Sequence, residues 1–125
     1  MNLDKHDTAV VLIDPQNEVL DASGLAWLLV RESLQENHTI EHMERLFKAA
    51  KSHGFEVFIS PHYCYPTDKG WQFNGPLETD EATSGMSART GILNLDGLDG
   101  SGADWMARFK PYIVKPERKK RGAKS

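Results

Sequence analysis

The sequence is poor in cysteine and in long hydrophobic stretches. Its single cysteine, Cys64, excludes an intramolecular disulfide framework and a zinc site built on several thiolates. The longest apolar stretches, residues 9–13 and 24–30, fall far short of the roughly 20 residues that span a bilayer. The amino terminus lacks the basic and apolar regions of a signal peptide. We therefore expect a cytoplasmic protein with a reduced thiol and no membrane partner.

Charge is distributed unevenly along the 125 residues. Residues 1–114 hold nine basic and seventeen acidic side chains, a balance of −8, whereas residues 115–125 hold six basic and one acidic, a balance of +5. A short basic terminus without interleaved aromatic residues is usually a solvated end, so we do not expect nucleic-acid binding. The length fits one domain or part of one, which we place at residues 1–114, followed by a basic tail at 115–125.

Two apolar segments flank an amphipathic one. Residues 8–14 form an unalternated aliphatic run that ends at Asp14-Pro15, which is typical of a strand covered on both faces. Pro15 should hold Asp14 in extended geometry. Residues 39–53 have the apolar stripe of a helix, with Thr39 as N-cap and Gly54 after its end, and residues 55–60 predict a second strand. Strand, helix and strand together predict a parallel α/β sheet with flanking helices, of which this chain holds an incomplete set.

The remaining segments are less regular. Residues 25–34 fit either a short helix or an extended segment, and residues 62–100 are rich in Gly, Pro, Thr, Asn and Asp without a sustained period. Residues 101–110 resemble a capped short helix ended by Pro111, and residues 112–114 suggest a third strand. Residues 97–102 lack the glycine spacing of a phosphate-binding loop, so we expect no nucleotide and no other cofactor.

The candidate chemistry lies where the strands end. Ligands of open α/β sheets bind outside the carboxyl ends of the strands, which would bring Asp14, His62 and Lys115 to one edge. A carboxylate beside a lysine can act as general acid or base, whereas the alternative reading is that Asp14 only begins a turn. We assign His62 to a substrate pocket or the surface rather than to a metal, because no second ligand is spaced to join it. Trp71 would add an aromatic pad, or ordinary packing.

Cys64 follows the second predicted strand. It could be a thiolate nucleophile, but the sequence around it supplies no helix N-terminus or second base to activate it. We interpret it as an inert thiol.

The run Ala9-Val10-Val11-Leu12-Ile13-Asp14-Pro15-Gln16-Asn17 resembles the opening strand of the isochorismatase-like cysteine hydrolases, whose signature is an apolar strand followed by Asp, one residue, Gln and Asn. Similarity extends over residues 39–53, 57–63, 66–71 and 75–78. The resemblance implies a Rossmann-like three-layer fold, Asp14 as catalytic acid/base, Lys115 as the family lysine, and Gln16, His62 and Trp71 around a small-molecule substrate with a C–N amide or vinyl-ether bond. Homo-oligomers are expected.

The same resemblance implies a nucleophilic cysteine that this chain does not carry, because Cys64 stands elsewhere than the family cysteine. We therefore expect residues 1–114 to be the amino-terminal part of such a hydrolase domain, in a member shortened at its carboxyl end. Some relatives cleave a vinyl ether with the Asp alone. The alternative is a non-catalytic fragment or interaction module that lacks the nucleophile and pairs its open sheet with itself or with a longer relative.

Overall fold

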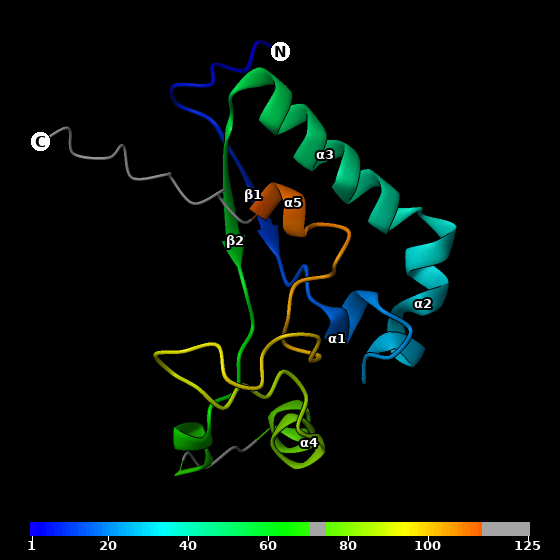
Figure 1. The fold of residues 1–125 in the computed structure, drawn as a ribbon. Helices are drawn as coiled ribbons and strands as arrows, with labels where there is room; N and C mark the ends of the chain where they lie inside the picture. The colour runs from blue at the N-terminus through cyan, green and yellow to red at the C-terminus, as the bar shows by residue number, and fades with distance from the viewer. Residues whose placement is uncertain (71–74, 114–125) are drawn as a thin grey trace, which may run out of the picture.

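The computed structural model describes residues 1–70 and 75–113, and it has mixed α/β structure (Figure 1). The elements in chain order are β1 (Ala9–Ile13), α1 (Asn17–Leu20), α2 (Trp27–Glu36), α3 (Thr39–His53), β2 (Glu56–Ser60), a 3₁₀ turn (Pro66–Gly70), α4 (Pro76–Ser84) and α5 (Lys110–Ile113). The basic tail, Trp71 and Lys115 lie outside the described residues.

The predicted strand–helix–strand unit is confirmed. β1 and β2 pair in parallel, with Val10 opposite Val57 and Leu12 opposite Ile59. The helix that connects them, α3, ends at Gly54, whose φ of 75° is the left-handed geometry that glycine adopts without strain. The prediction of Thr39 as N-cap is wrong: His38 takes that position, and Thr39 is the first helical residue.

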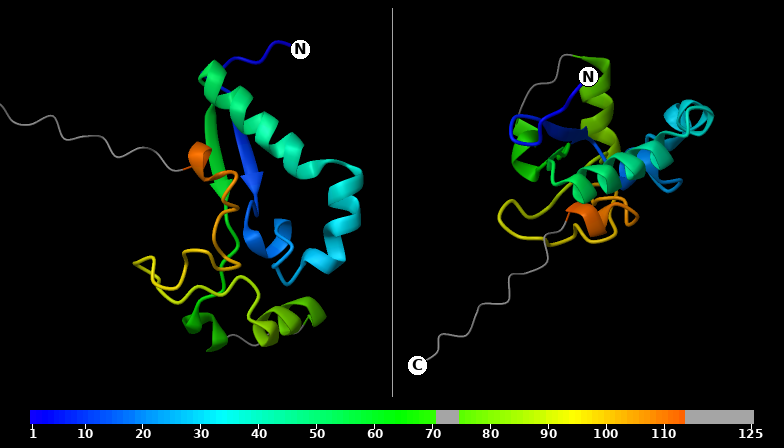
Figure 2. Two further views of the ribbon diagram at one scale, coloured as in Figure 1. Left: turned by 45° about the vertical axis from the view of Figure 1, so that its right-hand side comes forward. Right: turned by 90° about the horizontal axis from the view of Figure 1, so that it is seen from above.

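The core lies between the sheet and the helices on one side of it. Phe47 of α3 and Phe109 are fully buried, with ring centroids 5.1 Å apart, and Tyr112 of α5 stacks on Phe47 at 5.6 Å. Leu12 and Leu20 complete the buried cluster. Helices α3 and α5 lie on the same face of the sheet (Figures 1 and 2).

The opposite face of the sheet is exposed, so the prediction of a strand covered on both faces is wrong. Successive side chains of a strand point to opposite faces. In β1 and β2 every second residue therefore packs toward the core, and the residues between them face outward and are exposed. We call this second set the outer sheet face; it consists of Ala9, Val11, Ile13, Glu56, Phe58 and Ser60.

The segment before the described carboxyl end differs from its prediction. Residues 101–109 form turns and bends, and the helix is confined to Lys110–Ile113. Pro111 therefore lies inside a helix instead of ending one, at an early position where its missing N–H removes no helical hydrogen bond. Tyr112 and Ile113 are helical, so the predicted third strand is wrong for them. The aromatic packing of Tyr112 on Phe47 outweighs the strand preference of the local sequence.

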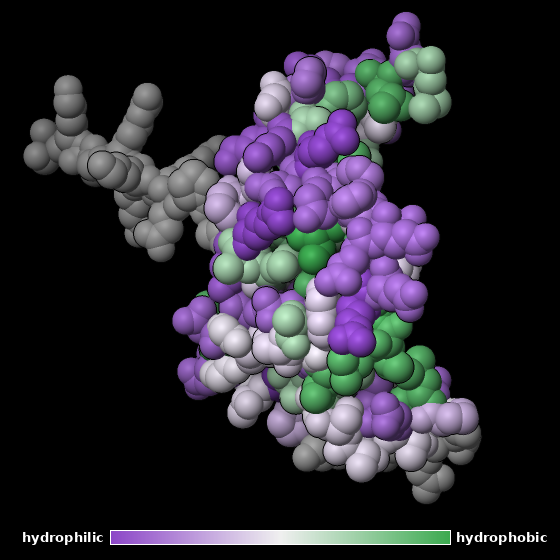
Figure 3. Space-filling view, turned by 90° about the vertical axis from the view of Figure 1, so that its right-hand side faces the viewer, coloured by the Kyte–Doolittle hydropathy of each residue, from purple (hydrophilic) through white to green (hydrophobic). Residues whose placement is uncertain are grey.

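Residues 25–34 were expected to form either a short helix or an extended segment. The structure has a helix here, α2, which begins at Trp27. None of its residues is buried, and Leu28 and Leu29 are largely exposed. Figure 3 shows the face that carries α2 and α3, where hydrophobic patches interrupt a hydrophilic surface. In the irregular stretch 62–100, α4 and the 3₁₀ turn are the helical elements among the described residues, and they lie beyond the carboxyl ends of the strands (Figure 1).

Candidate functional site at the carboxyl edge of the sheet

Asp14 is the first residue after β1. Its backbone N–H donates to the carbonyl of Ser60 at 3.0 Å, which ties it to the end of β2. Its φ is 52°, so the prediction of extended geometry is wrong. The Gln16 N–H donates to the Asp14 carbonyl at 2.7 Å and closes a three-residue turn centred on Pro15. Aspartate tolerates left-handed geometry better than most residues, and such backbone strain is common at functional sites.

Gln16 holds the two strand exits together. Its side chain is 1% exposed. Its amide oxygen accepts from the His62 N–H at 2.8 Å, and its amide nitrogen donates to the carbonyls of His62 at 2.9 Å and Ala103 at 2.6 Å. Gln16 and His62, both predicted as substrate-binding residues, are therefore in contact. The contact uses the whole Gln16 amide, so Gln16 positions the His62 backbone.

The Asp14 carboxylate is half-buried at this edge. Among the side chains of residues 1–68 and 75–113 and their backbone N–H groups, none donates a hydrogen bond to it, and no cation pairs with it. A carboxylate without a fixed partner remains able to exchange a proton with a ligand or with water.

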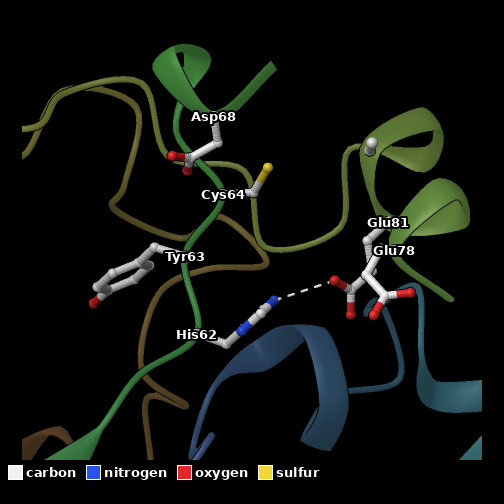
Figure 4. A pocket seen from close by; sticks show the side chains of 7 residues that line it. His62, Tyr63, Cys64, Asp68, Glu78 and Glu81 are labelled. Carbon is white, nitrogen blue, oxygen red and sulfur yellow. Dashed lines mark ion pairs between the residues drawn. The ribbon is translucent and has the colours of Figure 1, made fainter. Parts of the chain in front are cut away.

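A cavity of about 160 Å³ opens beside His62. It is lined by His62, Tyr63, Cys64, Asp68, Glu78, Glu81 and Ala82. His62 and Glu81 point toward one another across it, with Nε2 and Oε2 3.4 Å apart (Figure 4). Asp14 is not among the described residues that line it. His62 therefore links the Gln16 contact to the cavity. Its backbone is hydrogen-bonded to Gln16, and its ring lines the cavity.

The chain is extended after His62, so neighbouring side chains alternate in direction. His62 and Cys64 point to one side and Tyr63 to the other (Figure 4). The guanidinium of Arg89 lies 4.7 Å from the centroid of the Tyr63 ring, a cation–π contact. Burial raises the pKa of the Tyr63 phenol. Cys64 is half-buried, and its backbone bonds to Ser87 and Arg89 fix it in the wall between this cavity and a second one of about 350 Å³.

Glu18 is a buried carboxylate that the sequence did not reveal as important. It is 5% exposed, and its two oxygens accept from the N–H groups of Leu25 at 2.7 Å and Ser87 at 2.8 Å. The chain approaches it closely, because a Cβ atom on Gly102 would lie 2.2 Å from its Oε2. These two hydrogen bonds satisfy both carboxylate oxygens in the buried site. Glu18 therefore joins three segments of the chain, at Leu25, Ser87 and Gly102.

Asp104, which is buried, and Lys110, which is partly exposed, form a second polar contact near the site. The Asp104 carboxylate accepts from the N–H groups of Gly100 at 2.9 Å and Trp105 at 2.7 Å, and from the Lys110 ammonium at 2.5 Å. This hydrogen bond raises the pKa of Lys110 above its ordinary value. Trp105 also bridges to Gln16 through the backbone. The Asp104–Lys110 pair therefore helps to fix the segment around Ala103, whose carbonyl accepts a hydrogen bond from the Gln16 amide.

The structure brings Asp14, Gln16 and His62 to one edge, whereas the roles of Lys115 and Trp71 remain predictions outside the described residues. Within the described ranges, no three His, Cys, Asp or Glu side chains are placed to share a metal ion, and no helix has the length and hydropathy of a membrane span. No protein-family model, curated protein or solved structure gives a significant match to the chain.

Proposed function

We propose that this chain is an isochorismatase-like hydrolase that acts on a small molecule, with Asp14 as its acid/base. The observation that carries the proposal is a difference in hydrogen-bond partners among the carboxylates near the sheet edge. Glu18 and Asp104 are engaged by backbone N–H groups or by a lysine, whereas Asp14 has no such partner among the side chains of residues 1–68 and 75–113. A structural carboxylate is usually bonded, and a proton-transfer group has to be free to meet its substrate.

The backbone around Asp14 supports the same role. Gln16 fixes the turn after β1 to the exit of β2, so the position of Asp14 does not depend on a mobile loop. A catalytic group gains from such pre-organisation because its orientation costs nothing at the moment of reaction. The sequence resemblance supplies the reaction class, and Lys115 is proposed as the neighbouring cation.

Of the two candidate bonds, the vinyl ether suits these residues better. The carboxyl of Asp14 would donate its proton to the terminal alkene carbon, and water would add to the resulting oxocarbenium carbon. The C–O bond then breaks to give a ketone and an alcohol, and the carboxylate regains a proton. This route needs no thiolate. Amide cleavage needs a nucleophile, and Cys64, the single thiol, lines a cavity whose described walls do not include Asp14.

The test compares Asp14→Asn with Asp96→Asn, an exposed carboxylate on the loop before α5. Asparagine also tolerates left-handed backbone, so the turn at residue 14 should survive. We expect turnover of an enol ether of a small carboxylic acid, followed by release of the keto product, to fall by at least about 100-fold in Asp14→Asn. Asp96→Asn should match the wild type, and circular dichroism should show both variants folded. Equal turnover by Asp14→Asn, or no wild-type turnover of enol ethers and primary amides, would refute the proposal.

The second candidate is a non-catalytic interaction module. The specific observation in its favour is the outer sheet face, which leaves large apolar side chains exposed. A two-stranded sheet is rarely stable without further cover.

A further inference from the structure

The second cavity, of about 350 Å³, is lined by residues of the 3₁₀ turn, of α4 and of the segment 85–90. Its volume lies within the range of small-molecule sites. Backbone hydrogen bonds build one of its walls: the Cys64 N–H donates to the Ser87 carbonyl at 2.9 Å, and the Arg89 N–H donates to the Cys64 carbonyl at 2.9 Å. The backbone of Arg89 is therefore fixed against the segment that leaves β2.

Arg89 brings a cation to this cavity. Its guanidinium carbon lies 4.7 Å from the ring centroid of Tyr63 and 5.9 Å from that of Tyr65, and one Nη donates to the Asn94 carbonyl at 3.1 Å. Among the side chains of residues 1–68 and 75–113, no carboxylate forms an ion pair with it. Its Nε is buried, so the N–H groups that a ligand can reach are those of the two Nη atoms. A planar guanidinium held on aromatic rings is well suited to bind a carboxylate.

Two carboxylates line the same cavity. Asp68 accepts from the Tyr65 N–H at 2.7 Å through Oδ2, and Glu81 faces His62 through Oε2. Neither acid pairs with a lysine or an arginine among the side chains of residues 1–68 and 75–113. Both acids also line the first cavity, whereas Arg89 is not among the described residues that line it. The negative groups therefore lie where the two cavities adjoin, and the positive group lies away from that junction.

We propose that the second cavity binds a small zwitterion, an amino acid whose carboxylate contacts Arg89 and whose ammonium contacts Asp68 and Glu81. All three side chains are partly buried, which strengthens their interactions with a charged ligand. A ligand with a carboxylate alone would also meet two acidic side chains, and a ligand with an ammonium alone would also meet an arginine. A molecule that carries both charges satisfies both ends of the cavity.

This binding role goes beyond the proposed hydrolysis. Asp14 is not among the described residues that line the second cavity. Binding is measured without turnover, so the zwitterion site can fail while hydrolysis by Asp14 is confirmed, and the reverse can also occur.

The first experiment is isothermal titration calorimetry on the full chain. The probes are glycine, β-alanine, γ-aminobutyrate and ε-aminocaproate, which differ in the separation of their two charges. Each probe is compared with the acid and the amine that lack one of its charges, such as butyrate and propylamine for γ-aminobutyrate. At least one zwitterion should bind with a Kd below about 1 mM, and its matched acid and amine should bind at least about tenfold more weakly, because each makes one of the two charged contacts.

Substitutions test which side chains hold the ligand. Arg89→Gln and Asp68→Asn each remove one charge with little change in shape, and each should raise the Kd of the tightest zwitterion at least about tenfold. The control is Arg45→Gln, at an exposed position of α3, which should bind like the wild type. Circular dichroism should show all three variants folded.

The second experiment does not depend on the stability of any variant. When the tightest zwitterion is added to the wild type, the amide resonances of Ser84, Ala88 and Thr90, which line the cavity, should shift. Those of Leu46 and Ala49 on α3 should not. The proposal is overturned if no zwitterion binds the wild type, if the matched acid or amine binds as tightly, if Arg89→Gln binds unchanged, or if the shifts occur away from the cavity.

Discussion

Gln16→Leu is the substitution that most directly tests how the sheet edge is held. Leucine has a similar size but no polar atoms, so three backbone groups lose their partner: the N–H and carbonyl of His62 and the carbonyl of Ala103. A buried polar group without a partner costs about 1–3 kcal/mol. Ala103 is 1% exposed, so its carbonyl cannot regain water, whereas the His62 backbone lies beside a half-exposed side chain. We expect the free energy of unfolding to fall by about 2–4 kcal/mol.

The assay is urea unfolding followed by circular dichroism, with amide exchange of the His62 N–H as a local readout. The control is Gln35→Leu, at an exposed position of α2, which should change stability by less than about 0.5 kcal/mol. Gln16→Glu adds a second check. One carboxylate oxygen can still accept from the His62 N–H, but the other replaces the amide nitrogen and faces the carbonyls of His62 and Ala103. Gln16→Glu should be less damaging at about pH 4, where the carboxyl can carry a proton, than at pH 7. If Gln16→Leu is as mild as Gln35→Leu, the Gln16 contact does not hold the edge.

Three further substitutions test the core, the buried carboxylate Glu18 and the partly buried ion pair between Asp104 and Lys110. Phe47→Ala should lower the free energy of unfolding by about 3–5 kcal/mol in urea titrations, because Phe47 is fully buried, while Leu46→Ala, at a half-exposed neighbour, should cost less than about 1 kcal/mol. Glu18→Gln should cost about 1–3 kcal/mol, since its amide can accept only one of the two N–H bonds; an unchanged midpoint would contradict the role given to Glu18. The bond to Asp104 raises the pKa of Lys110, so the stability that the pair contributes is complete below about pH 10 and is lost as the pH rises through the raised value. Thermal unfolding should therefore show a steeper alkaline fall of Tm in the wild type than in Lys110→Met, and parallel curves would refute the coupling.

The local sequence determined the central unit of the fold. Aliphatic and β-branched runs predict β1 and β2, and the apolar stripe of α3 predicts the helix between them, because these preferences act over a few residues. Parallel pairing follows from that order of elements, since a helical crossover brings the second strand back in the same direction. The position of Asp14 at the carboxyl edge was therefore predictable, together with the approach of His62.

The tertiary structure decided how that edge is built. The Gln16 amide reaches residues 46 and 87 positions away, and Glu18 reaches Ser87, 69 positions away. No local pattern encodes such contacts, because they exist only when buried polar groups have to be satisfied together. Asp14 also adopts left-handed geometry, against the preference that Pro15 imposes on the residue before it, while its N–H and carbonyl are both hydrogen-bonded.

The sequence shows which residues of the strands are apolar, but it does not show which face of the sheet is covered. An unalternated run is equally consistent with a strand buried on both sides and with one that presents half of its side chains to a partner. Only the arrangement of α3 and α5 on a single face leaves Val11, Ile13 and Phe58 exposed. Burial is a property of how elements pack together, so it appears only when the chain is folded.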